Sequence, residues 1–148
     1  MLYFLGFLIH TIVGCVVMSN QGSHCGEKVA HYTQVEEKVI PPDMAVNTTI
    51  RWLIAEQDGA INFYMRLFMM GENSHIKGHF HPWEHEIFIV KGSGRVRIGE
   101  KYYDVSEGTA IYIPPNVEHE YWSEKGMWFI CVIPAKPTIE ERENPIKC

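Results

Sequence analysis

The middle of the chain consists of short runs of alternating apolar and polar residues, separated by turn-forming residues. β-branched and aromatic residues gather in these runs, and no stretch of a dozen residues between 27 and 133 has the 3.6-residue period of an amphipathic helix. Many short strands, spaced about ten residues apart, are typical of a β-sandwich or barrel, because closing a sheet removes its exposed edges. The predicted strands are 28–35, 47–56, 60–70, 74–81, 85–91, 94–98, 101–105, 109–113, 118–123 and 127–133.

Glycine, asparagine and proline mark the ends of these runs. Glycine and asparagine supply the positive φ that tight hairpins require. We therefore expect the chain to turn at each such position. The predicted breaks are Asp58-Gly59, Gly71-Glu72-Asn73, Pro82-Trp83, Gly92-Ser93-Gly94, Gly99-Glu100, Glu107-Gly108, Pro114-Pro115-Asn116 and Lys125-Gly126.

The last predicted strand, 127–133 (MWFICVI), is apolar on both faces. One face is expected to fill the barrel. A partner subunit or a second layer of the same domain would cover the other face, and the pattern leaves both possibilities open.

The two ends of the chain differ from the middle. Residues 1–26 form an N-terminal extension in which 2–18 are almost continuously apolar, and residues 134–148 form a tail with three prolines and six charges. The apolar run is at the short end of the length that spans a bilayer, and it has no basic residue before it. Two interpretations stay open, an extension without function or a weak membrane-targeting segment. Residues 27–133 are enough for a single domain.

The amino-acid composition indicates which classes of ligand the protein binds and in which cellular compartment it is expected. The 148 residues are 46% hydrophobic and carry a net charge of −5, which excludes collagen-like, coiled-coil and disordered chains. Without a Lys/Arg run, binding to nucleic acid is not expected, and a small molecule is the expected ligand. Cys131 is the one cysteine inside the predicted domain, which favours a reducing, cytoplasmic location. Membrane anchoring or export through residues 2–18 is the alternative.

Three histidines lie close together in the segment His79-Phe80-His81-Pro82-Trp83-Glu84-His85. Alternation along a strand places His79 and His81 on one face, and the turn that follows can bring His85 back to the same point. His119, just after Pro114-Pro115-Asn116, is a fourth candidate. A solvated polar face would also explain the alternation, but apolar strands flank the segment on both sides. The pattern therefore favours a metal site.

These residues resemble the two sequence motifs of the cupin superfamily, which implies an all-β, single-domain barrel of the double-stranded β-helix (jelly-roll) type. Asparagine replaces glycine at two motif positions, Asn73 and Asn116, and asparagine tolerates the left-handed backbone conformation. The first motif is carried by His79, His81, Glu86 and Gly92 or Gly94, and the second by Gly108, Pro114 and His119.

The segment HFHPWEHEIF is similar to a subgroup of small cupins that bind manganese through four histidines. The likeness covers most of residues 47–133, including IRWLI, NFYMRLF and FICVIP. It implies His85 as the third ligand instead of Glu86, a homodimer, and a pocket around the metal. By this resemblance the pocket is formed by Arg66, Ile76, Phe129 and Cys131.

The identity of the third ligand affects the expected chemistry. Two histidines with Glu86 would resemble the facial set of non-haem iron oxygenases, whereas four neutral imidazoles leave the charge of the ion uncompensated and make it a stronger Lewis acid. We expect one divalent transition metal, Mn(II) or Fe(II), with Cu, Ni or Zn as alternatives. Four carboxylates flank the histidines and are candidates to hold their second ring nitrogens: Glu84, Glu86, Glu118 and Glu120.

Three functions are compatible with this site. The leading hypothesis is a metal-dependent dioxygenase acting on a small organic substrate. The second is a metal-assisted isomerase or lyase in which a nearby glutamate moves the proton. The third is a cupin that binds or senses a small ligand without catalysis, since one fold supports several functions.

Overall fold

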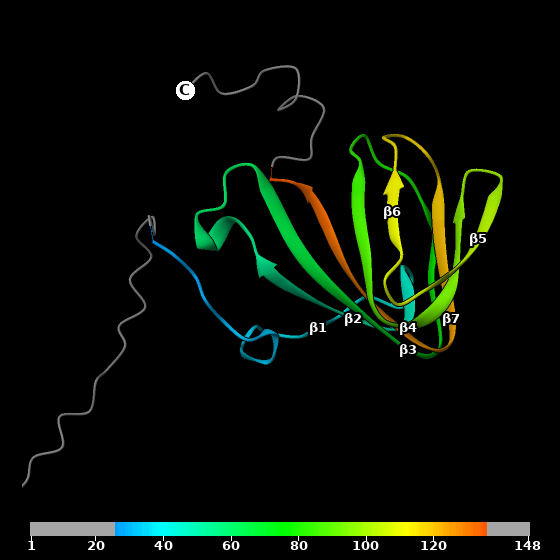
Figure 1. Cartoon of the computed structure of the whole chain (residues 1–148), viewed down its shortest axis with the longest axis horizontal. Coiled ribbons are helices and arrows are strands. Elements are labelled where there is room, and N and C mark those ends of the chain that lie inside the picture. The colour runs from blue at the N-terminus through cyan, green and yellow to red at the C-terminus, as the bar shows by residue number, and fades with distance from the viewer. Residues whose placement is uncertain (1–25, 136–148) are drawn as a thin grey trace, which may run out of the picture.

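Seven antiparallel strands make up most of residues 26–135, the part of the chain that this computed structural model describes (Figure 1). The strands pair in the order β1-β2-β3-β7-β4-β5, and β6 pairs with β4. The prediction of an all-β barrel is confirmed. The strands are β1 (Lys38–Val39), β2 (Ala45–Ile54), β3 (Phe63–His79), β4 (His85–Ile98), β5 (Lys101–Ser106), β6 (Ala110–Ile113) and β7 (His119–Pro134).

The predicted N-terminal extension, with its apolar run 2–18, and nearly all of the predicted C-terminal tail lie outside the described residues. Within residues 26–135 no helix has the length and apolar character needed to cross a membrane.

Three strands continue through positions at which the sequence predicts breaks, so those predictions are wrong. β3, β4 and β7 run through residues 71–73, 92–94 and 125–126, and Figure 1 shows these long strands curving. A Cβ atom on Gly92 would lie 2.1 Å from the carbonyl oxygen of Gly126, and one on Gly94 would lie 2.3 Å from that of Trp122. These glycines therefore allow β4 and β7 to pass very close to each other where both strands bend.

The predicted strand 28–35 is also wrong, because residues Tyr32–Gln34 form a short 3-10 helix. The Tyr32 ring meets the edge of Trp128 on β7, with ring centroids 5.9 Å apart. The Arg51 side chain donates a hydrogen bond to the backbone oxygen of Val35. This segment therefore packs on the outer face of the sheet through side chains and has no neighbouring strand in the ladder.

Inward side chains of all three long strands form one hydrophobic core. Asn73 and Asn116 have φ values of 50° and 61°, which confirms that asparagine adopts the left-handed conformation at both motif positions. The residues with the largest fully buried side chains are Phe129, Met70, Ile89, Ile113, Met127, His119, Val96 and Cys131.

The two faces of β7 have different environments. Phe129 and Cys131 point into the core, whereas Trp128, Ile130 and Val132 on the other face are only partly buried. Tyr32 covers Trp128. Phe88, which pairs with Ile130 from β4, is 48% exposed. Part of this apolar face is thus covered by the chain itself, and the rest is open to solvent.

Candidate metal centre

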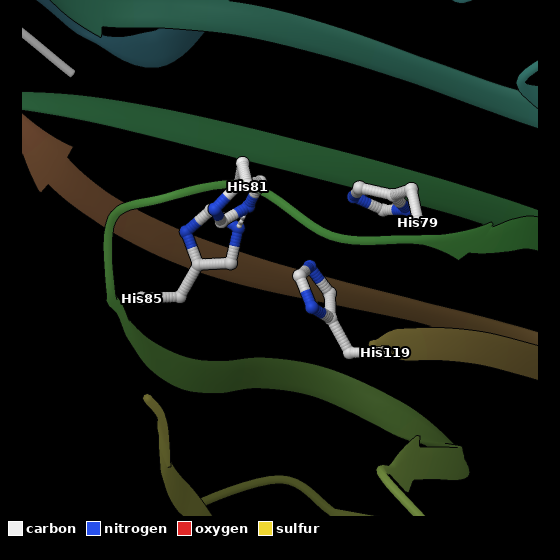
Figure 2. A group of neighbouring side chains, drawn as sticks. All are labelled: His79, His81, His85 and His119. Atoms are coloured by element: carbon white, nitrogen blue, oxygen red, sulfur yellow. Dashed lines mark hydrogen bonds between the residues drawn. The ribbon is translucent and has the colours of Figure 1, made fainter. Parts of the chain in front are cut away.

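The four histidines of the sequence motifs meet at one end of the barrel (Figure 2). His79 ends β3 and pairs in register with His119, the first residue of β7. His85 opens β4, and His81 lies in the connection between β3 and β4. One ring nitrogen from each histidine lies within 4.8 Å of those of the others. Strand pairing therefore brings together two parts of the chain that are distant in sequence.

Backbone carbonyl groups fix the orientation of three of these rings. The Nδ1 atoms of His79, His81 and His119 each lie 2.8 Å from a carbonyl oxygen, on Lys77, Trp83 and Val117 respectively. A carbonyl only accepts hydrogen bonds, so Nδ1 carries the proton in each ring. The lone pair of Nε2 is then free for the centre of the group, which is the arrangement that metal ligation requires.

His85 is held differently. Its Nδ1 atom lies 3.3 Å from Cys131 Sγ and 3.5 Å from Arg66 Nη2. Its Nε2 atom lies 2.6 Å from Nε2 of His81, the contact drawn as a dashed line in Figure 2. Side chains, instead of a backbone carbonyl, therefore set the orientation of this ring.

Burial keeps the two innermost rings neutral. It lowers the pKa of His85 from 6.5 to about 2 and that of His119 from 6.5 to about 4, and neighbouring positive charges, chiefly Arg66 for His85, add to the effect. Burial also lowers the pKa of His81. Nε2 of His119 is buried without any hydrogen-bond partner. An unpartnered, unprotonated nitrogen that faces three other imidazoles is an available metal ligand.

Glu86, the alternative third ligand, lies on the opposite side of β4. His85, Ile87 and Ile89 are buried, whereas Glu86 and Phe88 are exposed. Among residues 26–135, the group of side chains able to hold a metal contains four histidines and no carboxylate. The geometry thus favours His85 over Glu86.

Two of the carboxylates near the motifs, Glu118 and Glu120, bind other side chains instead of the ligand rings. Arg97 forms ion pairs with Glu118 at 3.1 Å and with Glu120 at 2.8 Å. Glu120 also lies 2.6 Å from Nε2 of His75, whose ring stacks on Trp122. His75 therefore belongs to a separate polar cluster.

A cavity of about 540 Å³ opens beside the histidines. All four residues that the resemblance implies for the pocket, Arg66, Ile76, Phe129 and Cys131, line it. Several other lining residues have no signal in the sequence, because their position depends on how β1, β2 and the loop after His81 fold over the site. These additional lining residues include Val39, Ile40, Pro41, Met44, Ile50, Trp52, Phe68, Trp83 and Tyr121.

The chemistry of the donor set fits a divalent transition metal. Imidazole is a good ligand for Mn, Fe, Ni, Cu and Zn, and four neutral rings leave room in an octahedral field for two further ligands. His85 and His119 lie deepest, and His79 and His81 are more open toward the cavity. A small molecule in the cavity would therefore have access to an ion at this site.

Comparison with known proteins gives the family. Residues 65–142 match the family described as AraC-like ligand binding domain. The polyketide cyclase RemF from Streptomyces resistomycificus is 31% identical, with a TM-score of 0.71 over 75% of this chain and 81% of that one. A search of curated proteins finds no significant match.

Two further solved structures share the fold. A cupin 2 conserved barrel domain protein from Rhodopseudomonas palustris is 24% identical, with a TM-score of 0.63, over 70% of this chain and 74% of that one. A predicted oxalate decarboxylase from Thermotoga maritima is 17% identical, with a TM-score of 0.65, over 72% of this chain and 98% of that one. Because the family model matches more than half of its length, the chain belongs to the family described as AraC-like ligand binding domain, and it shares the barrel fold of the cupin structures.

Proposed function

We propose that this protein is a metal-dependent enzyme that promotes ring closure or isomerisation of a conjugated carbonyl compound, such as a polyketide. The observation that carries the proposal is the donor set, four neutral histidines without a carboxylate, at the wall of an aromatic cavity. The 31% identity to a polyketide cyclase supports this class of substrate. This reaction is of the metal-assisted isomerase or lyase type.

Each part of the site has a role in this proposal. Nε2 atoms of His79, His81, His85 and His119 would hold the ion. A divalent ion there supplies Lewis acidity, which polarises a carbonyl oxygen and stabilises an enolate. The carbonyl groups of Lys77, Trp83 and Val117 hold three rings in the tautomer that ligation needs. Aromatic walls exclude water and orient a flat substrate.

A proton acceptor for this chemistry must reach the cavity. Glu86 faces outward, and Glu118 and Glu120 are engaged by Arg97. Asp43 is the acidic side chain among the described residues that line the cavity. We therefore assign the proton-accepting role to the Asp43 carboxylate in place of a glutamate.

Oxidative cleavage by a dioxygenase is the second candidate. The observation that favours it is the number of ligands, because the four histidines would hold an octahedral ion and leave room for two further ligands, which dioxygen and a substrate could provide. Mn(II) or Fe(II) would be the expected ion in this case. Ring closure requires no change of oxidation state, so a redox-inactive ion such as Zn(II) would also support it.

One experiment separates these activities. The full chain is purified without chelator, its metal is identified by elemental analysis, and samples loaded with Mn, Fe, Ni, Cu or Zn are incubated with a synthetic aromatic triketone. Oxygen uptake is followed with an electrode and products by mass spectrometry. Loss of one water without oxygen uptake, in a reaction that His119→Ala abolishes, supports ring closure.

The other outcomes are equally informative. Gain of two oxygen atoms with matching oxygen uptake would replace the cyclase proposal with the dioxygenase. Binding of the triketone without turnover at any metal would reject both in favour of a ligand-binding module. Asp43→Asn should lower turnover without lowering the metal content, and Glu120→Gln serves as the matched control.

A further inference from the structure

Arg66 lies near the start of β3 and lines the cavity next to the histidines. Its neighbours in the sheet are Trp52 on β2 and Cys131 on β7. The guanidinium group donates a hydrogen bond to Cys131 Sγ at 3.0 Å. It also lies over the rings of Trp52 at 5.5 Å and Phe68 at 5.1 Å from their centroids. These contacts fix the position of the charge.

In the described part of the chain, no carboxylate is paired with this guanidinium. Within residues 26–135 Arg66 forms no ion pair, whereas Arg51, Arg95 and Arg97 each have an acidic partner. A sulfur atom and two aromatic rings are weaker partners for a guanidinium than a carboxylate. A partly buried arginine without a counterion is costly to the fold, so its charge is available to a ligand.

The cavity as a whole carries positive charge. Lys38 and Lys77 line it together with Arg66, and Asp43 is the only acidic side chain among its described lining residues. Lys38 is paired with Glu36 at 3.3 Å, which leaves Lys77 and Arg66 as the cavity cations without an ion pair among the described residues. The complete chain, in contrast, has a net charge of −5. The cavity lining therefore has more positive than negative side chains, which favours an anionic ligand.

Three aromatic rings line the inner wall of the cavity. Phe129 is stacked between Phe68 at 4.9 Å and Tyr121 at 5.3 Å, with ring planes inclined by 12° and 17°. All three residues line the cavity. Because its two neighbours cover the faces of Phe129, an aromatic ligand would contact this stack through ring edges, and edge-to-face packing of aromatic rings is favourable. Arg66 stands over one end of this stack, at Phe68.

We propose that Arg66 is the anchor for an anionic group, a carboxylate or an enolate, of a planar aromatic ligand that packs on the Phe68, Phe129 and Tyr121 wall. This deepens the proposed function, on which it rests for the role of the ligand as substrate. The guanidinium offers two parallel donors to the anionic oxygens. An anion held there places the rest of the ligand between Arg66 and the histidines.

Binding of a matched pair of probes tests this assignment without any turnover. Naphthoate and naphthamide have nearly the same shape and differ in charge. Their dissociation constants are measured by calorimetry on the full chain after metal removal by a chelator, so that a metal ion cannot hold the carboxylate. The variants are Arg66→Met and Arg66→Lys, with Arg51→Met as the control, because Arg51 binds Val35 and Glu37 and does not line the cavity.

We expect wild type and Arg51→Met to bind naphthoate about tenfold or more tightly than naphthamide, the scale of one charge-assisted hydrogen bond. Arg66→Met should remove this preference, and Arg66→Lys should keep part of it. Equal affinity of the two probes for the wild type would overturn the assignment even if Arg66→Met failed to fold. An unchanged preference in folded Arg66→Met would overturn it as well. Since metal is absent from this experiment, its failure is distinct from failure of the proposed reaction.

Discussion

Cys131 Sγ lies 3.3 Å from Nδ1 of His85, in the position that a backbone carbonyl oxygen occupies, at 2.8 Å, beside each of the other three histidines. Burial raises the pKa of this thiol, so it is a neutral group at physiological pH. Its sulfur can accept a weak hydrogen bond from Nδ1–H. His85 is therefore the one histidine of the four whose orienting partner a mutation can remove.

Replacing this partner should weaken metal binding without destroying the site. Cys131→Val has a similar volume and no acceptor, and we expect its metal affinity to fall by about 10- to 100-fold, as is usual when a partner of a ligand ring is lost. Cys131→Ser keeps an acceptor and should stay closer to wild type. Competition with a chromophoric chelator measures both. Equal affinities of all three proteins would mean that the sulfur has no orienting role.

If all four histidines are metal ligands, removing one of them should change the metal content of the purified protein. His119→Ala removes the buried Nε2 that has no other partner and should abolish binding of one ion per chain. Glu86→Gln, on the outer side of β4, should leave the metal in place. Elemental analysis of the purified variants gives the stoichiometry. Retention of the ion in His119→Ala would contradict the site, and its loss in Glu86→Gln would show that the carboxylate is a ligand.

Acid should destabilise the metal-free protein. The pKa of His119 is about 4 in the folded state and 6.5 in the unfolded chain. Between these values the unfolded chain binds a proton that the folded protein does not, so the free energy of unfolding falls as the pH falls. Between about pH 7 and pH 5 most carboxylates stay ionised, which isolates the histidine contribution.

Thermal unfolding of chelator-treated protein measures this effect. The midpoint should decrease from about pH 7 to about pH 5, and less steeply in His119→Ala. A midpoint that is constant or rises over this interval would be incompatible with neutral buried rings.

The exposed part of the outer sheet face should mediate dimer formation. Phe88 is 48% exposed beside the partly buried Ile130 and Val132, and a second copy of the chain would cover them. Phe88→Glu should shift the protein from dimer to monomer in light scattering after size-exclusion chromatography. Tyr103→Glu, 45% exposed on β5, is the matched control. A monomeric wild type would refute this prediction.

Local sequence is sufficient for most of the strands and for the shared face of His79 and His81, because alternation along a strand determines which side chains share a face. The barrel type and the choice of His85 over Glu86 came from the resemblance to known motifs, and the position of His119 depends on the pairing of β3 with β7. Local sequence does not predict that β4 bends at Gly92 and Gly94 instead of ending there. Gly92 and Gly94 have the same backbone freedom in a hairpin as in a bend, and only the proximity of Trp122 and Gly126 on β7 distinguishes them. That proximity depends on strand pairing between residues that are distant in sequence.

The groups that hold the rings escaped prediction for a similar reason. Every residue has a carbonyl, so the roles of Lys77, Trp83 and Val117 follow from the path of the backbone and have no side-chain signature. Likewise, the residues that flank Trp52 in the sequence do not indicate that its side chain lines the cavity. Its place there results from its pairing with Arg66 on β3.

The separation of the histidines along the chain has a consequence for assembly of the protein. Three come from residues 79–85, and the fourth begins β7, the strand that lies between β3 and β4. An ion held by all four would act as a reversible cross-link that closes a long loop, and it would bind only after the last strand has docked. Supply of the cofactor would then govern the lifetime of the closed barrel as well as its reactivity.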